Sequence, residues 1–384
     1  MSDTHRSGVL PPIKGSWEDQ LFQAQQLVSQ QNDSAIPIFQ KLLDRLGLLP
    51  AAQRAAANGR LEQILRRAAI DLIYFLTYRE RYDEALATIT QVKTFLEENE
   101  LAQWDRHAIY ILVQAGQIDS ALERLRALAA TGVLDDWGDM LFIALDHNRL
   151  EDAVDAVRQA DAMLNKLLNQ EQDPEVANVY RGYVAILKSR LALAQGNIQE
   201  SMAWFEHAAA MDKRHRNHPQ PFYTQVLDKG YYDEALTLIR RDSQNPMRAG
   251  FWAGLALKRQ GDAAAAERQW FKVIQTKLPE QGDVDLLELV LAHYFLGDKK
   301  GVGLGMTLNT IQEEPEAFWG LYFLAGLGWA LRGDMTTARS DLRLAVMRHK
   351  SMAQGARLER HWGRIAADLL GPETYAALAE FFEQ

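Results

Sequence analysis

Apolar residues recur along most of the chain at spacings of three and four, with polar residues between them. Ile89 and Val92, for example, lie four and seven positions after Ala85. Residues with this spacing share one face of an α-helix, so the pattern predicts amphipathic helices. No stretch shows the sustained alternation that is typical of a β-strand. The chain has only 11 prolines, which fall between the expected helices. The sequence therefore predicts an all-α fold.

A short sequence motif recurs at the start of these amphipathic segments. It begins with glycine or another turn-forming residue, continues with polar residues and closes with a small residue about five positions later. Five clear copies span residues 116–121, 196–201, 230–235, 261–266 and 333–338. With three weaker copies included, the closing residues are Ala85, Ala121, Ala153, Ser201, Ala235, Ala266, Val302 and Ala338. Six of the seven spacings between them lie between 31 and 36 residues, which indicates a repeated structural unit.

Each copy has the residue types that join two helices by a tight turn. Glycine or asparagine accommodates the left-handed conformation that ends a helix. The acidic and amide residues that follow favour the first turn of the next helix, through capping and the helix dipole. The small residue fits where the two helices cross closely. The repeated unit is therefore expected to be a helix–turn–helix that buries its apolar face by stacking on the next unit.

The repeat resembles the tetratricopeptide repeat, a 34-residue helix–turn–helix unit that stacks into a right-handed superhelix. The turn motif and its closing small residue match in at least five units, over roughly residues 66–350. Gly254 and Gly326 stand twelve positions before a closing residue, where the family prefers glycine or alanine. The family's first-helix tryptophan and tyrosine are mostly replaced, and its closing proline is largely absent. The resemblance implies a right-handed α-solenoid whose first helices line a concave surface.

Four parts are expected along the chain. They are a disordered N-terminal tail (1–15), an N-terminal helical segment (16–60), a superhelix of about eight repeats (61–350) and C-terminal capping helices (351–384). The one long spacing predicts a lengthened helical pair near residues 150–195. A degenerate repeat is expected at Ala35, and breaks are expected at Leu49-Pro50 and Asn58-Gly59. The apolar residues expected to cover the open end of the core are Tyr375, Leu378, Phe381 and Phe382.

Composition narrows the function classes. The net charge is −9, which disfavours a generally basic nucleic-acid binder. The absence of cysteine excludes disulfides, thiolate nucleophiles and thiolate-bound metals. The most apolar stretch, Phe318 to Leu331, has fourteen residues, whereas a membrane-spanning helix needs about 20. We therefore expect a cytoplasmic protein with no membrane span in this chain, or the soluble part of a larger protein.

Arginine interleaved with aromatic residues is expected on the concave surface that the resemblance implies. These groove residues, counted back from each closing residue, are Arg67, Tyr74, Tyr78, Arg106, Tyr110, Phe142, Tyr183, Arg190, Arg248, Phe251, Lys258, Arg259, Tyr294, Phe295 and Phe323. Aromatic rings offer contact area at low entropic cost, and arginine offers paired donors to a carboxylate. A protein or peptide partner with acidic groups or a free carboxylate would suit such a surface. The alternative is that several of the aromatic residues pack between helices.

Two basic clusters and a glycine-rich loop are weaker candidates. The first cluster is Lys213-Arg-His-Arg-Asn-His218, which is either a phosphate or acidic-partner contact or a solvated loop. The second comprises Arg339, Arg343, Arg348, His349, Lys350, Arg357, Arg360, His361 and Arg364, which would contact nucleic acid or anionic lipid, or pair with Asp341, Glu359 and Asp368. The loop Gly301-Val-Gly-Leu-Gly305 fits close helix packing better than phosphate binding. No catalytic or metal-binding motif is present, so no cofactor is expected.

The sequence thus predicts a non-enzymatic scaffold or adaptor that binds a peptide or partner protein in its concave groove. One alternative is a soluble regulatory domain of a larger membrane-bound or multidomain enzyme. Another is an RNA-binding helical repeat protein. A double Arg106→Ala and Tyr110→Ala variant is expected to weaken partner binding and to leave the circular-dichroism melt nearly unchanged.

Overall fold

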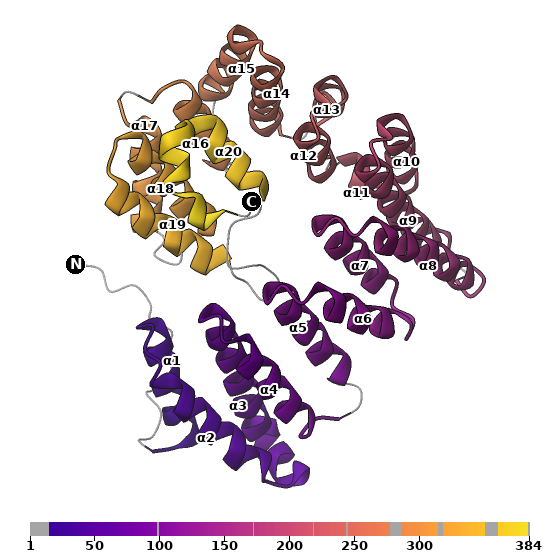
Figure 1. The fold of residues 1–384 in the computed structure, drawn as a ribbon, viewed down its shortest axis with the longest axis vertical. Coiled ribbons are helices and arrows are strands. Elements are labelled where there is room, and N and C mark those ends of the chain that lie inside the picture. The colour runs from indigo at the N-terminus through magenta and orange to yellow at the C-terminus, as the bar shows by residue number, and fades with distance from the viewer. Residues whose placement is uncertain are drawn as a thin grey trace. The chain divides into compact units, whose positions relative to one another are not determined.

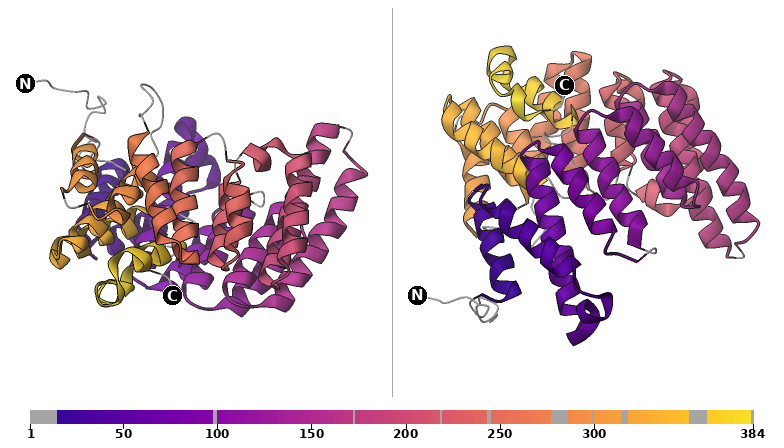
Figure 2. Two further views of the ribbon diagram at one scale, coloured as in Figure 1. Left: turned by 90° about the horizontal axis from the view of Figure 1, so that it is seen from above. Right: turned by 60° about the horizontal axis from the view of Figure 1, so that its bottom comes forward.

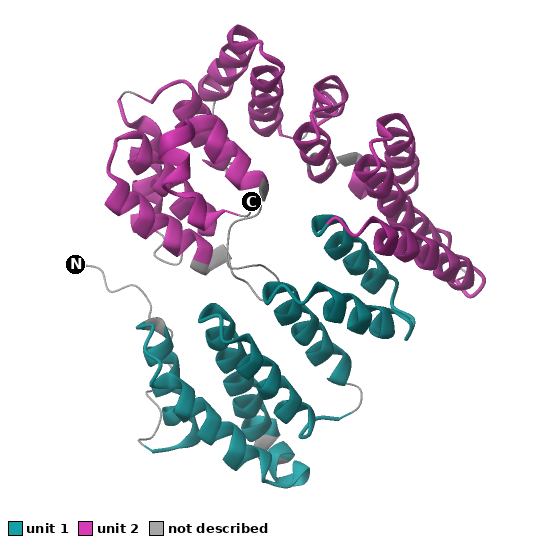
Figure 3. Cartoon of the chain, viewed as in Figure 1, with its two compact units in different colours: residues 1–147 teal, residues 148–384 magenta. Residues whose placement is uncertain are grey.

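The computed structural model contains only helices in the part of the chain that it describes (Figure 1). The described residues are 15–97, 100–171, 173–217, 219–242, 245–276, 286–298, 300–313, 318–349 and 360–382. Most of the expected N-terminal tail lies outside them. Two compact units follow each other along the chain, residues 1–147 and residues 148–384 (Figure 3). Most consecutive helices within each unit contact one another and run antiparallel (Figure 2).

The first unit stacks seven helices. They are α1 Trp17–Ser29, α2 Ala35–Gly47, α3 Ala51–Tyr78, α4 Tyr82–Lys93, α5 Leu101–Gln114, α6 Ile118–Ala129 and α7 Leu134–Asp146. The core of this unit lies between α1 to α5, where Phe39, Leu42 and Leu72 are fully buried. This arrangement is an all-α stack of helical repeats, as the periodic pattern predicts.

The second unit continues the same construction with longer and shorter helices. They are α8 Leu150–Leu168, α9 Pro174–Ala194, α10 Ile198–Met211, α11 Lys213–Asn217, α12 Gln220–Asp228, α13 Tyr232–Ile239, α14 Pro246–Gln260, α15 Ala263–Gln275, α16 Leu286–Phe295, α17 Val302–Glu313, α18 Trp319–Leu331, α19 Met335–His349, α20 Arg360–Leu370, α21 Pro372–Ala376 and the short 3-10 helix η2 Ala379–Phe381. The long helices α8 and α9 span the segment with the one irregular spacing.

The closing small residues lie where neighbouring helices cross. Seven of them are completely buried, namely Ala85, Ala121, Ala153, Ser201, Ala235, Ala266 and Ala338. Gly254 and Gly326 allow the close approach, because a Cβ atom at either would fall within 2.7 Å of the Trp270 or Leu342 side chain. These two contacts join a glycine to the residue four positions after the closing one, so the predicted helix–helix crossing is confirmed.

The eighth closing residue, Val302, was wrongly predicted. It is the first residue of α17 and is 44% exposed. In the clear copies the second helix begins two residues after the turn glycine, as Ile118 does after Gly116, whereas here it begins five residues after Gly297. Asp298 explains the longer turn, because its carboxylate accepts the Val302 and Gly303 amide N–H groups and sets a later helix start.

The break expected at Asn58-Gly59 does not end a helix. The helix α3 runs through it from Ala51 to Tyr78, although Gly59 adopts a positive φ of 71°. The break at Leu49-Pro50 is present, since Pro50 precedes the first residue of α3. The positive φ of Gly59 is thus a local irregularity within α3, and this helix contacts both α2 and α4.

The C-terminal segment packs onto the core of the second unit, as expected of a cap. Leu378 and Phe382 are completely buried, and Phe381 nearly so. Tyr375 stacks on Phe382 with ring centroids 5.7 Å apart. The helix α20 adds Ile365 and Ala366 to the same core. This segment therefore covers apolar surface that the last repeat would otherwise leave open.

The most apolar helix, α18, is a core element of the second unit. Leu321 to Leu327 are all buried between neighbouring helices. Across the described helices, none has both the length and the apolar character that crossing a bilayer requires. Short apolar helices of this kind are typical of the interior of a helical stack.

Candidate partner-binding surface

Arg106 of α5 is held by a buried carboxylate on α7. Its Nε and Nη2 atoms donate to the two carboxylate oxygens of Asp136 at 2.9 and 3.0 Å. The Asp136 side chain is 1% exposed, whereas that of Arg106 is 40% exposed. A buried carboxylate needs a compensating charge, so this bidentate pair fixes the position of the guanidinium. The positive charge of Arg106 therefore neutralises Asp136 within the first unit.

The surface beside Arg106 is acidic. Asp135, Asp136 and Asp139 occupy the first turns of α7. Although Asp139 reaches solvent, its pKa is raised to about 6, first by desolvation and then by the charges of Asp136 and Asp135, against the opposing effect of Arg106. Two unneutralised carboxylates beside one paired arginine would repel an acidic partner. The geometry here favours a cation over the carboxylate that the sequence suggested.

The other predicted groove residues of the first unit are partly accessible. Arg67 is exposed and pairs with Asp71 one turn along α3 at 3.0 Å. Tyr74 is half-buried, and its hydroxyl oxygen finds no hydrogen-bond partner among the described residues. Burial raises the pKa of Tyr74 to about 12, with a further contribution from the Asp71 charge. The remaining aromatic groove residues predicted in the first unit are also partly exposed, namely Tyr78, Tyr110 and Phe142.

In the second unit, Tyr183 and Arg190 on α9 are likewise partly accessible, while Arg248 on α14 is engaged internally. The Nε and Nη2 atoms of Arg248 donate to Asp242 at 3.0 and 3.1 Å. Asp242 is buried and also accepts the hydroxyl of the buried Tyr223 at 3.1 Å. This pair fastens the start of α14, so Arg248 supports the fold.

Three predicted groove aromatics belong to the core, which corrects their assignment. Phe251 and Phe323 are completely buried, and Tyr294 is 2% exposed. The Tyr294 hydroxyl donates to the backbone oxygen of Leu324 at 2.9 Å, so its polar end is satisfied inside the unit. Phe295 is only partly buried and stacks on Trp270 at 4.7 Å. A helix turns by about 100° per residue, so a register error of one position moves a side chain from a surface to the core.

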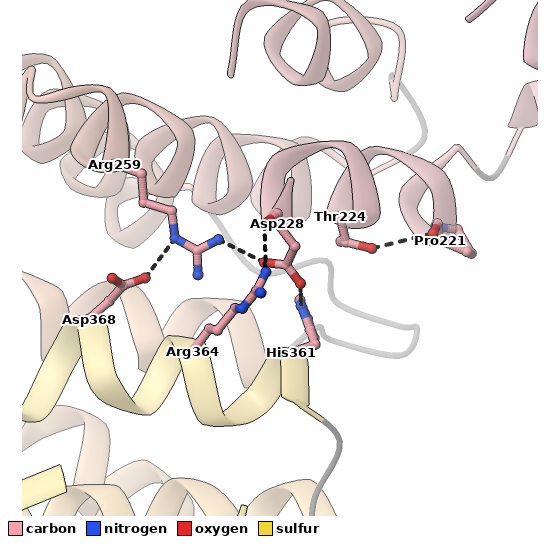
Figure 4. Close-up of polar contacts among 7 residues, drawn as sticks. All are labelled: Pro221, Thr224, Asp228, Arg259, His361, Arg364 and Asp368. Carbon is pink, nitrogen blue, oxygen red and sulfur yellow. Dashed lines mark hydrogen bonds and ion pairs between the residues drawn. The ribbon is translucent and has the colours of Figure 1, made fainter. Parts of the chain in front are cut away.

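The adjacent cations Lys258 and Arg259 at the end of α14 hold a residue far along the chain. Arg259 Nε donates to the carboxylate of Asp368 at 2.7 Å (Figure 4). Lys258 Nζ donates to the Asp368 backbone oxygen at 2.5 Å. The Lys258 ammonium also lies 4.6 Å from the ring centroid of Phe295. Burial lowers the pKa of Lys258, against the raising effect of the Asp368 charge. Two groove residues thus bind one acidic residue of α20.

Asp228, the last residue of α12, completes this site. It accepts Arg259 Nη1 at 2.8 Å and faces the Nδ1 atom of His361 at 3.4 Å (Figure 4). Arg364 Nη1 donates to the Asp228 backbone oxygen at 2.6 Å. Burial alone would raise the pKa of Asp228, but the hydrogen bonds and charges of His361 and Arg259 outweigh it and lower this pKa. The carboxylate is therefore held ionised between three cationic or ionisable groups.

Residues of α20 divide between two faces. His361, Arg364 and Asp368 lie at spacings of three and four and contact α12 and α14, where the His361 ring also stacks on Trp252 at 5.0 Å. Trp362 lies on the other face, with its ring centroid 5.2 Å from that of Trp319 on α18. We call the four residues that contact the polar face of α20 the helix seat, and they are Asp228, Trp252, Lys258 and Arg259.

Several members of the two basic clusters contact other residues of the chain. In the first cluster, Arg214 Nε donates to Asp212 at 2.8 Å. In the second, Arg339 donates to the Ala377 backbone oxygen at 2.9 Å, and His361 and Arg364 contact the helix seat. The remaining members whose side chains lie outside the described residues are His218 and Arg216 in the first cluster, and Arg348, His349, Lys350, Arg357 and Arg360 in the second.

The glycine-rich loop Gly301-Val-Gly-Leu-Gly305 has a structural role. In the glycine-rich loop, a Cβ atom at Gly303 would fall 2.9 Å from the Tyr294 ring, which fits close helix packing. Within the described ranges, no group of three or more His, Asp or Glu side chains is arranged to hold a metal ion.

Sequence reasoning missed Asp228 and the role of Asp368. The cluster that contains His361 and Arg364 predicts either a nucleic-acid or anionic-lipid contact or a charged outer face paired with Asp341, Glu359 and Asp368. In the structure the partners lie more than 100 residues away, on α12 and α14. Spacing along a helix shows which residues share a face, but it does not show what that face contacts.

Comparisons with known proteins do not identify a family for this chain. No protein-family model matches the chain. No curated protein matches it. Among solved structures, the chain is similar to the TPR domain of P58(IPK), solved as a crystal structure at 2.5 Å, with 13% sequence identity over 95% of this chain and 98% of that chain and a TM-score of 0.22. At that TM-score the fold assignment depends on the helices described above.

Proposed function

We propose that this chain is a non-enzymatic protein-interaction scaffold of the tetratricopeptide-repeat type that binds helical segments of a partner protein. The observation that carries the proposal is the helix seat on α12 and α14, whose Lys258 and Arg259 hold the carboxyl-bearing helix α20. This contact supports a surface able to recognise a helix by its charged side chains. A partner with acidic groups fits the two cations of α14.

The physical basis is charge-assisted hydrogen bonding at a partly desolvated surface. Arg259 is 11% exposed, so water screens its contacts with Asp228 and Asp368 less than it would screen those of a fully exposed ion pair. A stack of helical repeats also presents such side chains on several neighbouring helices at once. A bound helix can therefore be fixed in register by a few charged residues.

The two alternative functions gain no such support. Arg339 and Arg364 of the second basic cluster contact the chain's own carbonyl and carboxylate oxygens, which leaves less positive charge for RNA. A role as the regulatory domain of a larger enzyme and a cytoplasmic location stay predictions from the sequence.

A displayed library of helical peptides tests the proposal on the full chain. We expect selected peptides to carry a carboxylate and to lose binding when Lys258 is replaced by alanine. The matched control is Arg158→Ala on α8, an exposed arginine paired with Asp155 away from the helix seat, which should bind as the wild type does. Peptides that bind the wild type and the Lys258→Ala variant equally would contradict the proposed surface.

A further inference from the structure

The helix seat is already filled by a part of the same chain. α20 follows the last repeat in sequence, yet its polar face contacts α12 and α14, which lie more than 100 residues earlier. These helices are joined to α20 by side-chain contacts (Figure 4). A surface that binds helices and a helix that binds this surface thus occur in one polypeptide.

The contacts between α20 and the seat are reciprocal at two helix ends. Asp368 lies in the last turn of α20, where backbone carbonyl groups lack partners within the helix, and Lys258 donates to one of them. Asp228 is the last residue of α12, and Arg364 donates to its backbone oxygen. Cations near a helix C-terminus are favoured by the helix dipole. The end of α20 is therefore capped by a cation from α14, and the end of α12 by a cation from α20.

The two faces of α20 differ in the kind of contact that holds them. Ile365 and Ala366 are completely buried in the core, and Trp362 packs edge-on against Trp319 and Phe323. The polar face is more accessible, with side-chain exposures of 20% for His361, 27% for Asp368 and 39% for Arg364, although their partner residue Arg259 is only 11% exposed. Ion pairs that reach solvent are weakened by salt and can be replaced by an equivalent pair, whereas buried apolar contacts are not. The polar face is thus the replaceable side.

We propose that α20 is an internal, displaceable occupant of the helix seat and that it regulates access of the partner helix to this seat. The inference rests on the proposed function. The competing helix carries a carboxylate in its last turn, to meet Lys258 and Arg259, and an arginine four residues earlier, to meet Asp228. An aromatic or cationic side chain three residues before that arginine stacks on Trp252, as His361 does.

A fluorescent peptide in trans tests the occupancy directly. The probe is a stapled helical peptide with the sequence of residues 360–370, and its control is the same peptide with Asp368→Lys. Binding to the full chain is measured by fluorescence polarisation. An occupant that fills the seat in nine of ten molecules reduces the apparent affinity of a competitor about tenfold. We therefore expect weak binding to the wild type and binding about tenfold tighter to an Arg364→Gln and Asp368→Asn variant.

The same variant needs a control for folding and for specificity. Asp155→Asn with Arg158→Gln removes a comparable exposed ion pair from α8 and should behave as the wild type does. The double variant could fold poorly, so a single Asp368→Asn variant, which keeps the shape of the side chain, is measured as well. It should give a smaller gain in affinity for the probe. Adding Lys258→Ala to either variant should abolish binding of the probe.

Equal affinity of the probe for the wild type and both α20 variants would overturn the inference, as would binding that survives Lys258→Ala. The outcomes also separate the two proposals. Library peptides that require Lys258 but bind the wild type and the α20 variants equally would leave the scaffold function in place and remove the internal occupant. If no library peptide requires Lys258, the proposed surface itself fails.

Discussion

Arg106 in the first unit and Arg259 in the second were predicted as groove residues by the same counting rule, but they are used differently. Arg106 pairs with Asp136 on a helix of the same stack, 30 residues along the chain. Arg259 pairs with Asp368 on a helix outside the repeats, 109 residues along. The first pair stabilises the stack, because it neutralises a buried carboxylate. The second resembles recognition, because a separate helix is bound through its charged face.

The comparison also concerns the charge that each unit offers. Around Arg106 the acidic residues of α7 outnumber the cation, and desolvation together with their charges raises the pKa of Asp139. At the helix seat Lys258 and Arg259 stand side by side beside one carboxylate, Asp228. An acidic partner therefore suits the second unit, and a cationic group suits the α7 surface of the first. Arginine content alone does not identify an anion-binding surface.

The largest expected effect tests whether both units share one construction. Ala121→Glu in the first unit and Ala266→Glu in the second each place a charge at a completely buried helix crossing. Each should lower the free energy of unfolding by about 4 kcal/mol, since a buried unpaired carboxylate is costly. Urea denaturation followed by circular dichroism measures this. An unchanged free energy of unfolding in one unit would show that its helices cross at other residues. The two units would then not share one construction.

The next effect separates a supporting arginine from a binding one. Arg106→Ala strands the buried Asp136 carboxylate and should cost about 3 kcal/mol of stability. This replaces the sequence-based expectation that the Arg106→Ala and Tyr110→Ala variant melts almost as the wild type does. Arg81→Ala, at the residue just before α4, is the control, because both members of its ion pair with Glu84 are exposed. An unchanged melt for Arg106→Ala would restore Arg106 as a free surface residue.

Repeat architecture could be predicted from the sequence because its signals are local. Turn glycines and small closing residues act within one helix pair, and seven closing residues were placed correctly. Val302 failed because Asp298 delays the start of α17, which the glycine spacing does not show. The site could be predicted only in part. Lys258 and Arg259 were found by counting, but Asp228 and Asp368 meet them through long-range packing that no local pattern encodes.

A smaller effect tests the carboxylate of the helix seat. Asp228→Asn removes the charge that faces Arg259 and His361 and should cost about 2 kcal/mol at neutral pH. The pKa of Asp228 is lowered in the folded protein, so its contribution is present above the unfolded value of about 4. This contribution is lost as the pH falls through the folded pKa. Urea melts of both proteins at neutral and acidic pH should therefore converge at the acidic end.

The smallest effect tests the acidic surface of the first unit. Desolvation raises the pKa of Asp139 to about 6, so the folded protein binds a proton more tightly than the unfolded chain. Stability should fall as the pH rises from about 4 to about 6. Asp139→Asn should then stabilise the protein at pH 7 by less than about 1 kcal/mol, because solvent screens the group, and should have no effect near pH 4.

A nuclear magnetic resonance titration of Asp139 measures this pKa directly. An unshifted value, or equal stabilisation at both pH values, would mean that the α7 surface is not acidic enough to favour a cation. The contrast with the helix seat would then depend on Lys258 and Arg259 alone.

Amide hydrogen exchange across residues 360–370 of the full chain tests the central claim, with α18 as the internal reference. If α20 is a displaceable occupant held on one face by ion pairs, its protection should decrease about tenfold between low salt and about 500 mM salt while that of α18 stays constant. Protection of α20 that equals that of α18 and does not change with salt would contradict the account. It would show that α20 is a permanent part of the core.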